Sequence, residues 1–253
     1  MKDKLTILTT THFKASAHRI NTNYKINHDR LNTTTSLIER MIQSLYTHMG
    51  SYDIKHYISL DHDPHDEGSC IYLKNLQHLT TIYPNLHIIV TVDGIRQSIL
   101  NLVKSVQTEY FLYFEHDWEF VYPVDIQNLI NIFDHNKTIN YIRFNKRNNS
   151  QAGWDTIMKE YKFDSTYLCA TNAWSNNPYI ARTDNWINNW LPLLEQYSPA
   201  IPKYMYIEDE LMQYYQNDIR SIGWDEAVVK WGIYIYGKLN QANTVNHLNG
   251  RKL

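Results

Sequence analysis

Strand-like and helix-like segments alternate through the first 115 residues, and this alternation restricts the fold more than any other feature of the chain. Short runs of β-branched and aromatic residues with the length of buried strands lie at 5–10, 54–60, 86–92 and 110–114. Apolar residues at helical spacing follow the first three runs, at 37–49, 71–82 and 95–106. This order predicts a mainly parallel sheet with helices on both faces. Such sheets bind ligands at the carboxyl ends of their strands.

The second half of the chain gives weaker signals. Further helices are predicted at 126–133, 186–194 and 208–216, and further strands at 141–144 and 232–236. Apart from one of these helices, residues 145–202 are irregular in pattern and rich in Trp, Asn and Tyr. Neither a linker nor an internal repeat divides the sequence, so we expect one domain over 1–253.

Composition excludes several classes of protein. With 24 Lys and Arg against 26 Asp and Glu, the net charge is −2, and no basic field attracts nucleic acid. The two cysteines, Cys70 and Cys169, match neither a metal nor a redox motif, which favours a reducing compartment. A long apolar run is also missing, so we expect no transmembrane segment and a cytoplasmic location. Frequent Asn and Ile indicate an AT-rich coding sequence; if that source is viral, the location is the host cytoplasm.

The run that ends in Phe114 is followed directly by two acids. Glu115 and Asp117 are separated by His116, and alternation along an extended backbone places both carboxylates on the same side of the strand end. Two such oxygen ligands suit Mg²⁺ or Mn²⁺ bridging a diphosphate. An acidic turn without a metal has the same spacing, so the triplet by itself leaves both interpretations open.

The order of the elements, taken with the acid-x-acid triplet, resembles the GT-A glycosyltransferases, whose DxD motif lies at the end of the fourth strand. The resemblance extends over most of the chain and is most specific over 93–118. It implies an α/β, Rossmann-like fold with a mainly parallel sheet flanked by helices. Residues 1–118 would form the nucleotide-sugar-binding half, and 119–253 an irregular, aromatic-rich acceptor-binding half. Asp117 takes the position that binds the metal directly, and Glu115 replaces the family's first Asp, which contacts ribose or metal.

The resemblance also implies a donor site at the ends of the first two strands. The residues that match the positions for nucleobase and ribose binding are Thr9, Thr10, Thr11, Asp61 and Asp63. Hydroxyls and carboxylates bind base edges and ribose hydroxyls, although many strands also end in polar residues without any ligand. Arg96, early in the third helix, can meet a phosphate or the acidic triplet, or face solvent.

Two later segments match the family pattern by position. Tyr206–Glu210 resembles the ED pair of inverting members, so Asp209 first, and Glu208 second, are candidates to deprotonate the acceptor hydroxyl. Acids that begin a helix are also favoured by its dipole without catalysis. Near the C-terminus, His247 is a candidate metal ligand and Arg251 a candidate diphosphate contact, although a lone His or a basic tail is often only solvated.

These residues together predict a metal-dependent glycosyltransferase of the hexosyltransferase class. It would move a sugar, with inversion, from a UDP- or GDP-linked donor to a hydroxyl of a glycan or glycoprotein. Mn²⁺ or Mg²⁺, held by Asp117, Glu115 and His247, would stabilise the leaving diphosphate. A sugar-nucleotidyltransferase is one alternative, but 9–14 lacks the glycine of a phosphate loop. A non-catalytic carbohydrate-binding protein is the other, and it would not need these acids.

Overall fold

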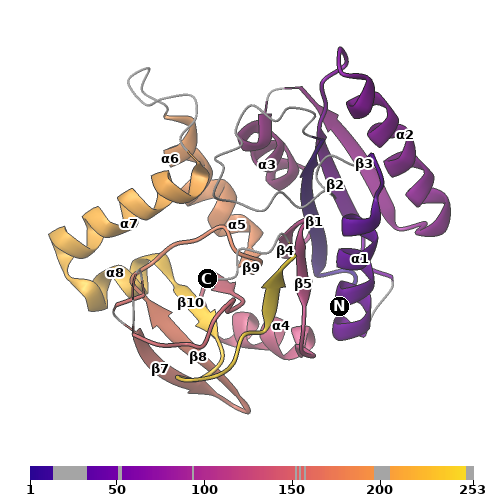
Figure 1. The fold of residues 1–253 in the computed structure, drawn as a ribbon. Helices are drawn as coiled ribbons and strands as arrows, with labels where there is room; N and C mark the ends of the chain where they lie inside the picture. The colour runs from indigo at the N-terminus through magenta and orange to yellow at the C-terminus, as the bar shows by residue number, and fades with distance from the viewer. Residues whose placement is uncertain are drawn as a thin grey trace.

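The computed structural model describes residues 1–13, 33–50, 53–92, 94–151, 153, 155–156, 158–196 and 206–248. The centre of the fold is a nine-stranded mixed sheet (Figure 1). Its strands, in spatial order, are β3 (Leu86–Thr91), β2 (His56–Asp61), β1 (Leu5–His12), β4 (Tyr110–Glu115), β9 (Tyr179–Arg182), β6 (Tyr141–Arg143), β10 (Ile233–Tyr236), β8 (Thr166–Thr171) and β7 (Met158–Phe163). The strand pairings make seven of the nine strands point one way, and β9 and β8 run opposite. The predicted mainly parallel α/β sheet is therefore confirmed.

Helices cover both faces of the sheet, because alternate residues of each central strand point to opposite sides. From β1, Leu5 and Ile7 pack with one set of helices, and Leu8 packs with the other. The first set is α1 (Ser36–Met49), α2 (Glu67–Ile82) and α4 (Ile126–His135). The second is α3 (Gly94–Ser105), α5 (Thr183–Asn185), a π-helical turn (Trp186–Trp190), α6 (Leu191–Glu195), α7 (Ile207–Ile222) and α8 (Trp224–Trp231). In Figure 1 the α3, α7 and α8 helices lie to the left of β1 and β4, and α1 and α2 lie to the right.

The helices of the first half follow local signals closely. The α1 helix ends at Gly50, which adopts the left-handed conformation and donates its N–H to the carbonyl of Tyr46. The α2 helix starts at Glu67, four residues before the expected start at 71, because the Asp66 carboxylate accepts a hydrogen bond from the backbone N–H of Ser69. No helix among the described residues is long and apolar enough to cross a membrane.

The second half contains more regular structure than its pattern predicts. Strands β7, β8 and β9 lie within 145–202, where the sequence indicated only a helix. A small second sheet pairs β5 (Trp118–Phe120) with β11 (Val245–His247), and neither strand was predicted. The edge strand β7 was missed because only one of its six residues is buried, so it has no clear apolar pattern. The α8 helix was missed as well.

A layer of aromatic rings joins the antiparallel part of the sheet to the second set of helices. Trp174, Trp186 and Trp190 are almost fully buried and contact one another edge to face. Tyr141 of β6 and Tyr179 of β9 pack against the same rings. These tryptophans are therefore part of the core, and the layer fixes β6 and β9 against the second set of helices.

Candidate active site

The ends of β1 and β4 bring a strand-end hydroxyl beside the acidic triplet. The two strands pair in parallel with Thr10 opposite Glu115. Thr10 Oγ1 lies 2.8 Å from the hydroxyl of Tyr113, which donates a long hydrogen bond of 3.5 Å to Glu115 Oε1. Asn176, from the loop between β8 and β9, donates its Nδ2–H to the same Glu115 oxygen at 2.9 Å. Tyr113 and Asn176 therefore hold the Glu115 carboxylate, and Thr10 of β1 in turn holds the Tyr113 hydroxyl.

Two buried carboxyl groups lie at this strand end. Burial first, then the charge of Asp117 and to a smaller extent that of Glu208, raise the pKa of Glu115 to about 8. The Asp117 side chain is only 4% exposed. Two buried carboxylates this close together are stabilised by a cation, since each opposes the ionisation of the other.

The C-terminal part of the described chain returns to the same place. Pairing of β11 with β5 sets His247 opposite Trp118, and the two rings meet edge to face at 4.8 Å. His247 Nε2 lies 3.3 Å from Asp117 Oδ2, and the backbone N–H of Leu248 donates to the Asp117 carbonyl at 2.7 Å. The structure thus brings together two of the three predicted metal ligands, with Glu115 two residues away in β4.

This donor set suits a cation that binds together with a phosphate ligand. Within the described part of the chain, no group of three or more His, Cys, Asp or Glu side chains forms a ready metal cage. Mg²⁺ and Mn²⁺ usually keep waters and bind through one or two carboxylates plus phosphate oxygens. Asp117 and His247 fit that arrangement, and Glu115 adds a nearby carboxyl group whose ionised form a bound cation would favour.

The predicted donor residues divide between the site and the protein interior. Thr9 Oγ1 lies 2.9 Å from His56 Nε2, and Thr11 Oγ1 lies 2.8 Å from the Tyr72 hydroxyl. Thr9 and Thr11 are at most 1% exposed, and they alternate with Thr10 along β1, which turns their side chains to the opposite face of the sheet. Thr10 therefore lies on the side of the triplet and Thr9 and Thr11 on the other, and nucleotide binding by the three hydroxyls stays a prediction.

The acids at the end of β2 and in the loop that follows it bind nearby backbone N–H groups. Asp61 Oδ1 accepts a hydrogen bond from the backbone N–H of Gly94 at 3.1 Å, at the start of α3. Asp63 is exposed, and its Oδ1 accepts the N–H of His65 within the loop before α2. Arg251, the predicted diphosphate contact, lies outside the described residues.

Arg96 joins α3 to α7. Its Nη1 donates to Glu210 Oε2 at 2.7 Å, and its Nη2 donates to the Leu194 carbonyl at 2.8 Å. The Glu210 side chain is 2% exposed and the Arg96 side chain 22% exposed. Arg96 therefore binds a carboxylate of α7, and the contact fixes the first turn of α7, which carries Glu208 and Asp209.

Arg96→Ala is expected to lower the free energy of unfolding by about 3 kcal/mol, because it leaves the buried Glu210 carboxylate without its counter-charge. Urea denaturation measures the change. The control is Lys2→Ala, whose partner Asp53 is exposed, and we expect a change below about 1 kcal/mol there. Equal effects of the two variants would contradict the structural role of Arg96.

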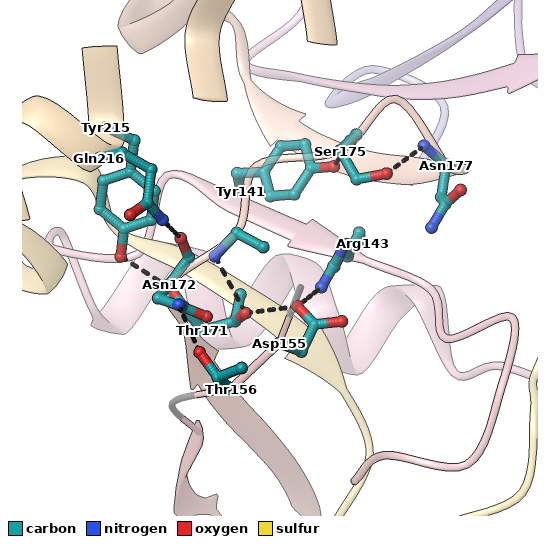
Figure 2. Close-up of polar contacts among 11 residues, drawn as sticks. Tyr141, Arg143, Asp155, Thr156, Thr171, Asn172, Ser175, Asn177, Tyr215 and Gln216 are labelled. Atoms are coloured by element: carbon teal, nitrogen blue, oxygen red, sulfur yellow. Dashed lines mark hydrogen bonds and ion pairs between the residues drawn. The ribbon is translucent and has the colours of Figure 1, made fainter. Parts of the chain in front are cut away.

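A pocket of about 320 Å³ opens between the segment after β6 and the first turn of α7. Glu208 and Asp209 line it on the α7 side; Glu208 is half-buried and Asp209 exposed. Ser175 and Asn177 also line the pocket, and Asn176 between them binds Glu115, so this part of the wall borders the triplet. On the sheet side, Arg143 binds Asp155, which also accepts a hydrogen bond of 2.7 Å from Thr171 (Figure 2).

Sequence reasoning missed several residues of this region. Arg143 and Asp155 carried no motif, although an arginine within the apolar run 141–144 was a signal for a buried partner. Asn176 gave no signal, since its contact with Glu115 depends on how the loop before β9 crosses the sheet. Lys146, which lines the pocket and lies over the Trp118 ring at 5.9 Å, gave none either.

Comparisons with known proteins agree on the fold and leave the family unassigned. No family model and no curated protein sequence matches the chain. Among solved structures, one described as a glucose-1-phosphate thymidylyltransferase from Bacillus anthracis, in complex with a sucrose, has a TM-score of 0.54 at 11% identity and covers 98% of this chain and 91% of that one. Residues 1–349 of S. aureus TarS give a TM-score of 0.53 at 12% identity, covering 95% of this chain and 59% of that one.

A third structure is the mannosyltransferase PcManGT from Pyrobaculum calidifontis in complex with GDP-Man and Mn²⁺, with a TM-score of 0.51 at 11% identity. It covers 93% of this chain and 57% of that one, so this chain spans less than three fifths of both PcManGT and the TarS fragment. The fold is therefore the GT-A type, which glycosyltransferases share with a nucleotidyltransferase.

Proposed function

We propose that this protein is a metal-dependent glycosyltransferase that moves a sugar from a nucleotide-sugar donor to an acceptor hydroxyl. The observation that carries the proposal is the acidic pair Glu115 and Asp117 at the end of β4, next to a pocket that presents a third carboxylate, Glu208. A transferase needs both parts, because the leaving diphosphate needs positive charge and the attacking hydroxyl needs a base.

In this mechanism Asp117 and His247 would hold a cation that binds together with the diphosphate, and Glu115, fixed by Asn176, would contribute negative charge or a ribose contact. Bound Mn²⁺ or Mg²⁺ supplies Lewis-acid stabilisation of the diphosphate. Glu208 accepts the proton of the acceptor hydroxyl. We place Glu208 before Asp209, the first choice from sequence, because Glu208 is half-buried and its charge acts on Glu115, whereas Asp209 is exposed. A base facing the donor across the pocket gives inversion at the anomeric carbon.

Two neighbours suggest which donors to test. TarS has been crystallised with UDP, and PcManGT with GDP-Man and Mn²⁺. We therefore propose a UDP- or GDP-linked sugar as donor and a glycan or glycoprotein hydroxyl as acceptor. The nucleotide, the sugar and the linkage depend on pocket shape.

Calorimetry with UDP- and GDP-sugars, with and without Mn²⁺, tests the proposal. We expect donor binding to tighten at least tenfold with Mn²⁺, together with slow hydrolysis of the donor. Likeness to the thymidylyltransferase makes a nucleotidyltransferase the second candidate, so a parallel assay supplies a nucleoside triphosphate with a sugar 1-phosphate. Release of pyrophosphate in that assay without donor hydrolysis would overturn the transferase proposal. Sugar binding whose affinity depends on neither the nucleotide nor the metal would indicate a non-catalytic carbohydrate-binding protein.

A further inference from the structure

The pocket beside α7 separates positive from negative side chains. Glu208 and Asp209 line it from α7, whereas Arg143, Lys146 and Arg147 line it from the end of β6 and the segment that follows, together with one carboxylate, Asp155, which is bound to Arg143. Lys146 and Glu208 act on each other electrostatically, and no ion pair joins them in the described chain. The carboxylates of α7 can therefore accept the proton of a hydroxyl, and the cationic groups on the other side can bind an anion.

Arg143 is the best-placed group on the cationic side. It is 5% exposed and lines the pocket wall, where Figure 2 shows its guanidinium directed at Asp155. That contact uses Nη2, and among the described residues no hydrogen bond uses Nε or Nη1. A guanidinium with unused donors in a mostly buried position binds carboxylate or phosphate oxygens strongly, through charge-assisted hydrogen bonds.

Asp155 does not remove this capacity. Thr171 also donates to the Asp155 oxygen that binds Arg143, so the carboxylate is shared and fixes the guanidinium in place. Lys146 and Arg147, which are exposed and line the pocket, add positive charge, and no carboxylate among the described residues forms an ion pair with them. An anionic ligand therefore meets one ordered arginine inside and two cations outside.

We propose that the pocket takes an anionic acceptor, a sugar or polyol that carries a carboxylate or phosphate, with this group on Arg143 and its reacting hydroxyl toward Glu208. The acceptor role rests on the proposed function; the anion site does not. The acids of α7 repel the anionic group and the cations attract it, so charge alone orients the ligand across the pocket. A neutral glycan gains nothing from this arrangement.

Matched probe pairs test the inference without donor or metal. Methyl glucuronoside is compared with methyl glucoside, and glycerol 3-phosphate with glycerol, by NMR-detected titration at low ionic strength. We expect at least one charged member to bind about tenfold or more tightly than its neutral partner. The pair that shows the preference identifies carboxylate or phosphate as the preferred group. The preference should shrink as salt is added, because Lys146 and Arg147 are exposed.

Arg143→Gln should abolish the preference, and Arg143→Lys should keep only part of it. Arg220→Gln is the control: it removes the same charge from an exposed position of α7 outside the pocket and should leave the preference intact. Lys146→Gln with Arg147→Gln alters only exposed side chains and should weaken the preference even if the Arg143 variants fold poorly. Equal binding of both members of each pair by the wild-type protein overturns the inference. Donor hydrolysis with Mn²⁺ is measured separately. It tests the proposed transferase function independently of the anion site.

Discussion

Asp117→Asn is expected to lower kcat for sugar transfer by about a thousandfold or more, with loss of the Mn²⁺ dependence of donor binding. The substitution keeps the size of the side chain and removes the charge that faces His247 at the end of β4. A metal-stabilised leaving group is worth several kcal/mol, and each 1.36 kcal/mol changes the rate tenfold. Steady-state kinetics and Mn²⁺ titration of donor binding measure both effects on one preparation.

The control for this experiment is Glu119→Gln, two residues further along the chain. Glu119 pairs with Arg40 of α1 at 2.8 Å and lies outside the proposed metal site. We expect its activity to remain within about threefold of the wild-type value, since the substitution changes an ion pair whose arginine is exposed. If Asp117→Asn left both turnover and manganese affinity unaltered, the proposed role of the metal would be contradicted.

The sequence predicts the first half of the fold well because its elements carry their own signals. The apolar stripe of α1 with Gly50 at its end, and the run 110–114, indicate the correct structure without tertiary information. In contrast, β9 is four residues long and lies antiparallel between β4 and β6. Its position depends on partners distant in sequence, and no local pattern contains that information.

The candidate site shows the same division. Glu115 and Asp117 follow a buried strand and could be identified from their spacing, whereas the role of Thr9 depended on which face of β1 its side chain occupies. Arg143 binds Asp155, which also accepts a hydrogen bond from Thr171. Asp155 and Thr171 both lie in the part of the chain where the sequence pattern is irregular. Residues that act through distant partners were therefore the ones that sequence reasoning missed.

Glu208→Gln and Asp209→Asn distinguish the two candidate bases. We expect Glu208→Gln to lower kcat for transfer by about a thousandfold, because a general base contributes a factor of about 10² to 10⁴. Asp209→Asn should change kcat by less than about tenfold, since Asp209 is exposed and Glu208 is the acid whose charge acts on Glu115. Both variants should bind the donor and Mn²⁺ like the wild-type protein, because neither residue belongs to the pair formed by Asp117 and His247.

The stereochemistry of the product provides an independent check on this base. A carboxylate that deprotonates the acceptor on the face opposite the leaving diphosphate requires a single displacement, and a single displacement inverts the anomeric carbon. NMR of the new linkage reports the configuration directly. A retained configuration would contradict the single displacement, and a larger loss in Asp209→Asn than in Glu208→Gln would show that Asp209 and not Glu208 accepts the proton of the acceptor hydroxyl.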